Sequence, residues 1–303
     1  MKRKILLISV IFVIICSLLF SYGGSLGIPN WQQIFGFAGL STFNSNIESP
    51  FAVHVIDVGK ADSIYIKCED QNILIDSGAP SLKPKVIDYL KSQHVNTLDL
   101  VVASHSDDDH IGNLAKVIKT FYVKRFCTDN EDKSTVTNIS CYNNMLSALK
   151  SKNIPVEHPK AGQRLNLKHA RIDVLAPLNK YNNANDSALV LKITYEKTKF
   201  LFTGDIENPA EEDILNSGED ISCDVLKVAH HGSKTSSSQE FLDKANPKYA
   251  VISVGPDRNN LPDKLVIDRI LSDNIHLFRT DEDGTVIFTS DGEHIKTLTE
   301  KSR

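Results

Sequence analysis

The segment SHSDDDHIG, residues 104–112, places two histidines and three aspartates within six consecutive positions. Three adjacent carboxylates repel one another, so they require either solvent or a bound cation. In the spacing H-x-D-x-D-H, alternate residues face one side, so His105, Asp107 and Asp109 can point together. His110 then turns in behind them. Because imidazole nitrogens and carboxylate oxygens bind zinc, manganese or iron, the segment predicts either a metal site or a solvated acidic turn.

This alternation makes the three aspartates unequal. Asp107 and Asp109 are predicted to face the cation, whereas Asp108, like Ser106, is predicted to face outward. Alanine should therefore be tolerated at position 108 but not at its two acidic neighbours.

Acidic and histidine side chains also follow apolar, strand-like runs elsewhere in the chain. Asp76 ends NILIDSG, Asp205 ends FLFTGD, and His230 and His231 end DVLKVAHHGS. Loops that leave adjacent strands can converge on one site. Aspartate beside glycine is also an ordinary turn former, and HHG could be a polar strand exit. Together with SHSDDDHIG, which follows the apolar run 98–103, these make four such endings in one chain, and they favour a shared metal centre.

The elements that must position these residues alternate between strand and helix signals. Short β-branched runs bounded by turn residues predict strands at 51–58, 63–69 and 72–78, and a second series of strands begins near residue 170. Helices are predicted at 86–90, 111–121, 207–216, 239–245 and 263–272. Asp-Gly turns at 283–284 and 291–292 predict a hairpin. Two such series would be well buried as two packed sheets with helices on both outer sides.

The first 22 residues differ from the rest of the 303-residue chain. A Lys-Arg-Lys cluster at 2–4 precedes 16 uncharged, mostly apolar residues at 5–20, the pattern of a secretory signal. This segment is either cleaved or retained as an N-terminal membrane anchor. Its positive flank predicts that the remainder of the chain lies outside the cytoplasm. Residues 23–50 are interpreted as a linker to a hydrolase domain at 51–303.

Composition is ordinary for a globular protein, with 41% hydrophobic and 24% charged residues. The net charge is −4, and removing the three cations at 2–4 leaves −7 on the predicted exported part. Proteins that coat DNA nonspecifically are expected to be basic, so any nucleic-acid contact must be local. None of the five cysteines forms a C-x-x-C pair, which argues against a structural zinc site. Cys127 and Cys141 are predicted either to form a disulfide or to remain free.

Together the motifs resemble those of a metallo-β-lactamase-fold hydrolase, and more narrowly the soluble hydrolase domain of ComEC-type competence proteins, as a stand-alone member. Motifs in the same order carry this resemblance over about residues 51–290: VIDVGKADS, SHSDDDHIG, NDSALVLKI, FLFTGD, DVLKVAHHGSKTS, AVISVG and RTDEDGTVIF. The resemblance implies an α/β protein with the four-layer αββα metallo-β-lactamase fold, two mixed sheets and outer helices. It also implies two divalent transition metals, zinc or manganese.

The resemblance assigns a role to each matching residue. His105 and Asp107 would bind the first metal. Asp109 and His110 would bind the second, and Asp205 would bridge the two. Asp109 could also orient the attacking water.

His230 or His231 would complete the ligand set, and the other would face the substrate. The resemblance does not decide between them. Asp76 would orient ligands from behind. The polar residues Ser233 and Lys234 after HHG could donate to a phosphate, or could belong to a helix-capping loop.

The chain departs from the family pattern in two places. The usual histidine of the third motif is absent, leaving Asn185, Asp186 or Ser187 in its place, so the first metal site is expected to be weak. The stretch NNLPD at 259–263 lacks the tyrosine and the histidine of the family's N-x-Y-G-H-P, so the substrate can differ from that of competence nucleases. The predicted supporting or substrate-facing positions are Asp57, Asp76, Asp186, Ser187, Ser233 and Lys234.

The predicted function is that of an extracytoplasmic metal-dependent phosphodiesterase, nuclease-like by resemblance, that uses a metal-activated hydroxide. The alternatives are a cell-wall phosphorylcholine or teichoic-acid esterase, and a lactonase or β-lactamase-type hydrolase. An alternative of another class is a metal-dead surface binding module. The implied partners are a phosphodiester or small ester, DNA by resemblance, and the membrane through the N-terminal segment. No obligate protein partner is inferred.

Overall fold

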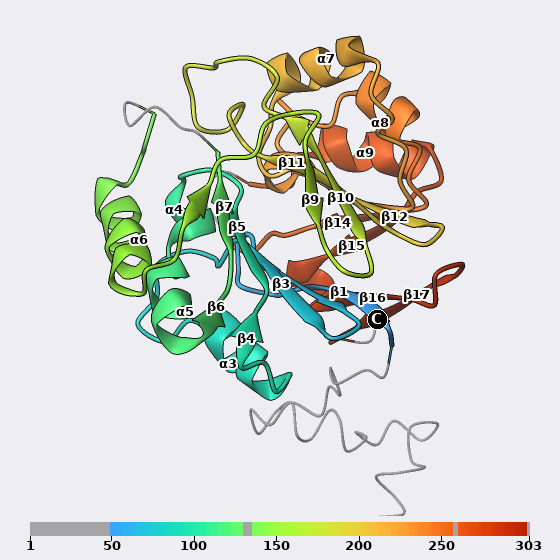
Figure 1. The fold of residues 1–303 in the computed structure, drawn as a ribbon. Helices are drawn as coiled ribbons and strands as arrows, with labels where there is room; N and C mark the ends of the chain where they lie inside the picture. The colour runs from blue at the N-terminus through green and yellow to red at the C-terminus, as the bar shows by residue number, and fades with distance from the viewer. Residues whose placement is uncertain (1–48, 130–134, 257–259, 302–303) are drawn as a thin grey trace, which may run out of the picture. The chain divides into compact units, whose positions relative to one another are not determined.

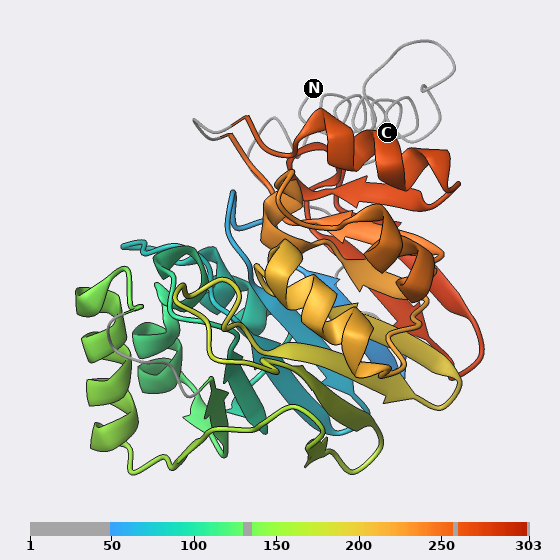
Figure 2. The same ribbon diagram turned by 90° about the horizontal axis from the view of Figure 1, so that it is seen from above.

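The computed structural model describes residues 49–129, 135–256 and 260–301. In this part of the chain two β-sheets pack face to face and helices cover both outer faces (Figures 1 and 2). The αββα arrangement with two mixed sheets is therefore confirmed. The predicted signal or anchor at 1–22 and nearly all of the predicted linker lie outside the described residues. Among the helices that are described, none is long and apolar enough to cross a bilayer.

The first sheet has eight strands in the order β17-β16-β1-β2-β3-β5-β7-β8. Their bounds are β1 Phe51–Val55, β2 Ile64–Cys68, β3 Gln71–Ile75, β5 Leu100–Ala103, β7 Phe126–Thr128, β8 Val156–Glu157, β16 Val286–Ser290 and β17 Ile295–Thr299. Strands β3, β5, β7 and β8 are parallel, so their carboxyl ends lie at one edge of the sheet. β4 (Thr97–Leu98) and β6 (Tyr122–Val123) form a separate two-stranded parallel sheet beside β3.

The second sheet has seven strands in the order β15-β14-β13-β12-β11-β10-β9. Their bounds are β9 Arg164–Asn166, β10 Arg171–Ala176, β11 Val190–Tyr195, β12 Thr198–Phe202, β13 Val225–Lys227, β14 Tyr249–Ile252 and β15 His276–Arg279. Strands β12 to β15 are parallel, so this sheet also has an edge at which several carboxyl ends meet.

Successive strand residues serve different cores because side chains alternate across a sheet. In β3, Ile73 packs between the sheets whereas Leu74 packs beneath helices. In β12, Phe200 faces the space between the sheets and Leu201 faces the helices on the other side. Because both faces are covered, these strands read as nearly continuous apolar runs.

The helices form the two outer layers (Figure 1). The first sheet is covered by α3 Lys85–Ser92, α4 Asp108–Ile111, α5 Leu114–Thr120 and α6 Ile139–Ser151. The second sheet is covered by α7 Asn208–Ser217, α8 Gln239–Ala245 and α9 Lys264–Ser272. The last three agree closely with the helices predicted for that half of the chain.

The helix predicted over 111–121 is confirmed for Leu114–Thr120 (α5), but its predicted start is wrong, because Ile111 belongs to α4 and the two helices are separated at Gly112 and Asn113. A Cβ atom on Gly112 would lie 2.4 Å from neighbouring backbone atoms, so the chain passes too closely there for any other residue. The Asn113 side chain donates to the carbonyl oxygen of Ser77 at 3.1 Å. This break ties the loop after β3 to the segment that follows SHSDDDHIG.

Only one of the two Asp-Gly pairs makes a hairpin turn. The pair at 291–292 joins β16 to β17, as predicted. The pair at 283–284 instead ends a short helix, α10 (Thr280–Asp283), so that part of the prediction is wrong. Asp283 accepts a hydrogen bond from the backbone of Arg279 at 2.8 Å, which closes a helical turn in place of a strand turn.

Helix α6 was not predicted, and it contains one of the two cysteines considered for a disulfide. Asn138 caps the helix by accepting a hydrogen bond from the backbone of Cys141 at 3.1 Å. Cys141 and Cys127 are both free thiols, which decides between the two alternatives. Burial raises the pKa of Cys127 to about 12, so this thiol stays protonated at neutral pH.

Candidate metal centre

Most of the predicted metal ligands, and Asp76 behind them, lie where parallel strands of both sheets end. Asp76 follows β3, His105 follows β5, Asp205 follows β12 and His231 follows β13. The centre is therefore assembled from strand ends that are far apart in the sequence and belong to two sheets packed against each other.

The cluster consists of His105, Asp109, His110, Asp205 and His231. His110 Nε2 lies 3.3 Å from Asp205 Oδ2. His231 Nε2 lies 3.3 Å from Asp109 Oδ2 and 3.4 Å from Asp205 Oδ2. Three overlapping sets of candidate ligands share His110: one adds His105 and Asp205, the second adds Asp109 and His231, and the third adds Asp62 and Asp76. Within each set the ligand atoms lie within 4.8 Å of one another.

Several polar atoms that point into this cluster make no well-formed hydrogen bond. They are the Nε2 atoms of His105, His110 and His231 and Oδ1 of Asp205, all buried. Burying an unsatisfied polar group costs about 1–3 kcal/mol. Nitrogen and oxygen atoms that converge in this way suit a divalent transition metal. The residues present therefore fit the metals that the sequence predicts.

The opposite nitrogens of two imidazoles are fixed by acceptors. His110 Nδ1 donates to Asp76 Oδ2 at 2.9 Å, and Asp76 itself accepts from the backbone and hydroxyl of Ser104 at 2.8 and 2.7 Å. His231 Nδ1 donates to the carbonyl oxygen of Ser253 at 2.8 Å. Because a carbonyl can only accept, the proton of His231 must be on Nδ1. Nε2 then presents its lone pair to the cluster.

The histidine pair 230–231 has one residue in the cluster and one outside it. The His231 side chain is fully buried, whereas that of His230 is 22% exposed and its Nδ1 lies 3.0 Å from Glu207 Oε1. Both residues have positive φ, 47° and 52°, within the short helical turn Ala229–Gly232. This turn sends the two rings in different directions, with their centroids 6.4 Å apart. The geometry therefore makes His231, and not His230, the candidate ligand of this pair, and His230 lies at the rim of the cluster.

The charges of the cluster are coupled. Burial alone would raise the pKa of Asp205, but His231 and His110 hold it well below its usual range. Burial would lower the pKa of His110, but Asp205 and Asp76 hold it well above its usual range. Burial, helped by His110, lowers the pKa of His105 to about 4. At neutral pH Asp205 is therefore ionised, His105 is neutral and His110 is protonated, so a metal held by His110 would have to compete with a proton.

Asp107, predicted as a ligand, lies at the margin of the cluster. Its Oδ2 is 3.8 Å from His105 Nε2, and its Oδ1 accepts a hydrogen bond from Thr137 at 2.8 Å. The Asp107 side chain is 24% exposed, and partial burial raises its pKa. Among the described residues, Asp109 but not Asp107 belongs to a set of converging candidate ligand atoms.

The two residues predicted to face outward behave differently. Asp108 Oδ2 accepts a hydrogen bond from Asn138 at 3.0 Å, outside the cluster, in agreement with that prediction. Ser106, in contrast, is buried, so its predicted exposure is wrong. The backbone turns into α4 directly after Ser106, and this ends the simple alternation of an extended segment.

Two of the three substitutes proposed for the missing third-motif histidine, Asp186 and Ser187, make their hydrogen bonds outside the cluster. Asp186 accepts hydrogen bonds from the backbone of Glu207 and the side chain of Asn183, both at 2.9 Å. Ser187 donates to the carbonyl oxygen of Asn183 at 2.8 Å. Both carboxylate oxygens of Asp186 are thus used to hold the loop before β11 against the start of α7.

The remaining predicted positions surround the centre. Asp57 accepts a hydrogen bond from the backbone of Gly59 at 3.2 Å and shapes the loop after β1. Ser233 pairs with the hydroxyl of Thr235 at 2.9 Å, and Lys234 is exposed. These residues lie in the loops that follow β1 and β13.

Three charged residues beside the cluster were not predicted from the sequence. Lys60 Nζ lies 2.8 Å from Asp109 Oδ2. Lys227 and Asp62 form an ion pair at 2.8 Å, with side chains only 1% and 2% exposed, and Asp62 Oδ1 is 3.8 Å from His231 Nδ1. A lysine inside the apolar run DVLKVA was a signal that could have pointed to the pair.

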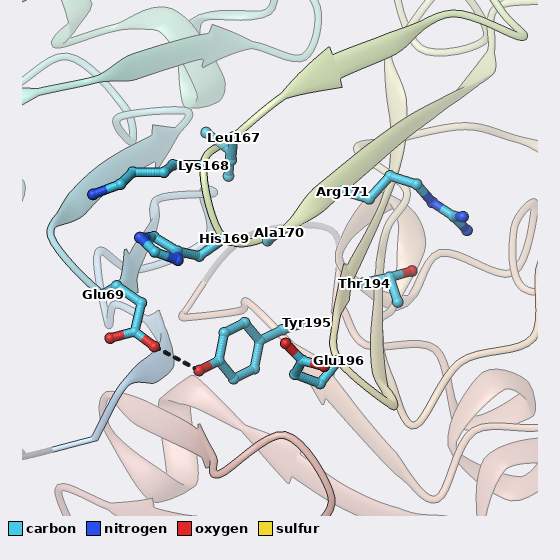
Figure 3. A pocket seen from close by; sticks show the side chains of 9 residues that line it. All are labelled: Glu69, Leu167, Lys168, His169, Ala170, Arg171, Thr194, Tyr195 and Glu196. Carbon is cyan, nitrogen blue, oxygen red and sulfur yellow. Dashed lines mark hydrogen bonds between the residues drawn. The ribbon is translucent and has the colours of Figure 1, made fainter.

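A separate surface cavity of about 440 Å³ lies at the other edge of the sheets (Figure 3). Its lining residues belong to the turns that lead into β3, β10 and β12 and to the adjoining ends of β10 and β11, whereas Asp76 and Asp205 follow the opposite ends of β3 and β12. There, Tyr195 donates a hydrogen bond to Glu69 at 2.8 Å. The basic side chains Lys168 and Arg171 are paired with nearby aspartates. This cavity is therefore distinct from the histidine–aspartate cluster.

Comparison with known proteins identifies the class. Residues 56–255, more than half of the chain, match the family described as the Metallo-beta-lactamase superfamily, and the chain belongs to this superfamily. The metallo-beta-lactamase fold protein YhfI from Bacillus subtilis shares the fold, with a TM-score of 0.57 and 13% identity over 80% of this chain and 100% of that protein. The chain is accordingly a metal-dependent hydrolase of that superfamily.

Two relatives place the chain more narrowly. It is 31% identical to ComE operon protein 3 of Bacillus subtilis (strain 168) over 266 residues, which cover 79% of this chain and 33% of that protein. It is 27% identical to Competence protein ComA of Neisseria gonorrhoeae over 284 residues, which cover 92% of this chain and 38% of that protein. The chain thus spans about a third of the length of these curated relatives. The resemblance to competence proteins is confirmed.

Proposed function

We propose that the chain is an extracytoplasmic metal-dependent phosphodiesterase whose active site is the histidine–aspartate cluster. The observation that carries this proposal is the convergence of buried imidazole Nε2 atoms with Asp205 and Asp109 at the joint edge of the two sheets. Divalent metals, when bound there, lower the pKa of water and stabilise negative charge on the attacked centre. We propose two such metals, zinc or manganese.

Some side chains of the site would hold the metals, and others orient the imidazole rings. Asp109, His110, Asp205 and His231 would hold one metal, with Asp205 shared with a second metal beside His105. Asp76 and Ser253 keep two of the imidazoles in the required tautomer and orientation. Asp109 lies on the open side of the cluster, where its second oxygen can accept a proton from an attacking water.

The choice of a phosphodiester rests on the relatives. Two of them are named for competence, which supports a nucleic acid or another phosphodiester as the substrate. The charge of −7 that remains without the N-terminal cations supports a local rather than an extended contact with DNA. That charge also favours the second candidate, a small cell-wall diester such as phosphorylcholine on teichoic acid. The basic and apolar residues 1–22 support export.

The activity can be tested on the full chain with a panel of substrates and added zinc or manganese. The panel contains bis-p-nitrophenyl phosphate, p-nitrophenylphosphorylcholine, linear DNA and nitrocefin. We expect hydrolysis of at least one diester and none of nitrocefin. Hydrolysis of nitrocefin alone would contradict the proposal, and intact DNA beside a cleaved small diester would exclude the nuclease version. Less than one bound metal per chain would favour a binding module.

Export can be tested separately in cells. A reporter enzyme that is active only outside the cytoplasm, fused after residue 303, should be active. It should lose activity when residues 1–22 are deleted. Full activity of the deletion fusion would contradict an extracytoplasmic location that depends on this segment.

A further inference from the structure

Lys60 brings a positive charge to the open side of the candidate centre. Its Nζ lies 2.8 Å from Asp109 Oδ2, and the two side chains are 24% and 17% exposed. The imidazoles of His110 and His231 are fully buried. Lys60 therefore reaches the cluster from the solvent side, which is the side from which a substrate must arrive.

The backbone at Lys60 is held in place by its neighbours. Gly255 lies so close that a Cβ atom on it would be 2.8 Å from Gly59 Cα and from the backbone nitrogen of Lys60. The backbone nitrogen of Asp62 donates to the carbonyl oxygen of Asp109 at 3.2 Å. The start of the Lys60 side chain is thus fixed beside Asp109, while its four-carbon stem allows the ammonium group to shift.

The other lysine beside the cluster has no such freedom. Lys227 is 1% exposed, pairs with Asp62 at 2.8 Å and donates to the carbonyl oxygen of Val228 at 2.8 Å. Its charge offsets that of a buried carboxylate beneath the histidines. Of the two lysines, Lys60 is the one that a bound molecule can touch.

We propose that Lys60 is a specificity-determining residue that binds an anionic oxygen of the substrate. This inference rests on the proposed phosphodiesterase function and deepens it. A metal on Asp109 would take over the neutralisation of that carboxylate and weaken its attraction for the lysine. The ammonium group, a donor of three hydrogen bonds, then serves a non-bridging phosphate oxygen. Lys60 thereby selects an anionic diester over a neutral ester.

The test compares Lys60→Gln, which removes the charge, with Lys60→Arg, which retains it. Lys85→Gln is the matched control, because Lys85 also contacts the loop after β1, donating to the carbonyl of Asp57 at 2.9 Å, but is 65% exposed. Inorganic phosphate is titrated calorimetrically onto the metal-loaded full chain. Metal content is measured for each variant.

We expect Lys60→Gln to weaken phosphate binding about 10- to 100-fold, the size of one hydrogen bond between charged groups. Lys60→Arg should lose less than about fivefold, and Lys85→Gln should match the unmodified chain. Metal content should be the same in all four proteins. The KM for bis-p-nitrophenyl phosphate should rise in Lys60→Gln, while that for p-nitrophenyl acetate should not.

Phosphate binding that is unchanged in Lys60→Gln, or absent from the unmodified chain, would overturn the proposal. A loss of metal in Lys60→Gln would overturn it as well, since Lys60 would then act on the metals and not on the substrate. Phosphate binding is scored without turnover. A chain that binds phosphate through Lys60 but cleaves no diester would therefore contradict the phosphodiesterase proposal alone.

Discussion

The two sides of the candidate metal centre are built with different firmness. On one side, His110 and His231 are buried, and their Nδ1 atoms are anchored by Asp76 and by the carbonyl of Ser253. On the other side, Asp107 is partly exposed and is held by a threonine hydroxyl that precedes α6. Both sides include residues of the same H-x-D-x-D-H segment, so the difference comes from what packs behind each side chain. We expect one metal to bind tightly and a second to exchange readily.

The largest effect should come from the histidine pair that ends the β13 loop. His231→Gln removes a buried candidate ligand, so most bound metal and more than about 99% of diesterase activity should be lost. His230→Gln changes a side chain at the rim and should alter activity less than about fivefold. Metal content and hydrolysis of bis-p-nitrophenyl phosphate check both. If His230→Gln lost more metal and activity than His231→Gln, then His230, and not His231, would be the ligand.

Alanine substitutions of the three aspartates in SHSDDDHIG should cause different losses of metal and activity, largest at Asp109 and smallest at Asp108. Asp109→Ala should abolish activity, because this carboxylate lies 3.3 Å from the anchored His231 Nε2 and shares a set of candidate ligands with it and His110. Asp107→Ala should leave about one metal bound and reduce activity about tenfold. Asp108→Ala, the control, should lose only its contact with Asn138. Metal counts per chain separate these cases, and equal losses in all three variants would contradict the difference between the sides.

Proton competition should give a smaller, graded effect on the firm side. Because the pKa of His110 is raised by Asp205 and Asp76, a metal must displace a proton from this ring at neutral pH. Lower pH favours the protonated ring, so metal affinity should fall as pH falls, up to about tenfold per pH unit. Calorimetry in buffers of different ionisation enthalpy should detect about one proton released per tight metal. Affinity that is independent of pH between 6 and 8 would disagree.

The smallest effect is expected at Asp186, in the region of the missing third-motif histidine. An asparagine can still accept from the backbone of Glu207, so Asp186→Asn should keep the metal content and alter activity less than about threefold. Loss of one metal in this variant would show that the loop supplies a ligand to the loose side after all.

Much of the architecture could be predicted because strand periodicity and burial are encoded locally. The runs around Ile73 and Phe200 are apolar because both faces of their strands are covered, and this pattern is visible in the sequence. The residues that follow such runs were candidates for the same reason. The break at Gly112 was missed because it depends on a close backbone approach rather than on periodicity.

The details of the site could not be read in the same way. The choice of His231 over His230 follows from a turn with two positive φ angles, which neighbouring loops stabilise. The pairing of Lys60 with Asp109 joins loops 49 positions apart in the chain. The pairing of Lys227 with Asp62 joins the two sheets. Such contacts exist only after the sheets have packed, so spacing alone does not reveal them.

The candidate ligands come from both halves of the sandwich. His105, Asp109 and His110 lie in the loop and short helix α4 that follow β5 of the first sheet, whereas Asp205 and His231 follow β12 and β13 of the second. A bound metal would therefore link the two sheets, and unfolding would require its dissociation. At a free metal concentration about a thousand times the dissociation constant, metal binding would contribute about 4 kcal/mol to the free energy of unfolding. Catalysis and the stability of the packing between the two sheets would then depend on the same ligand atoms.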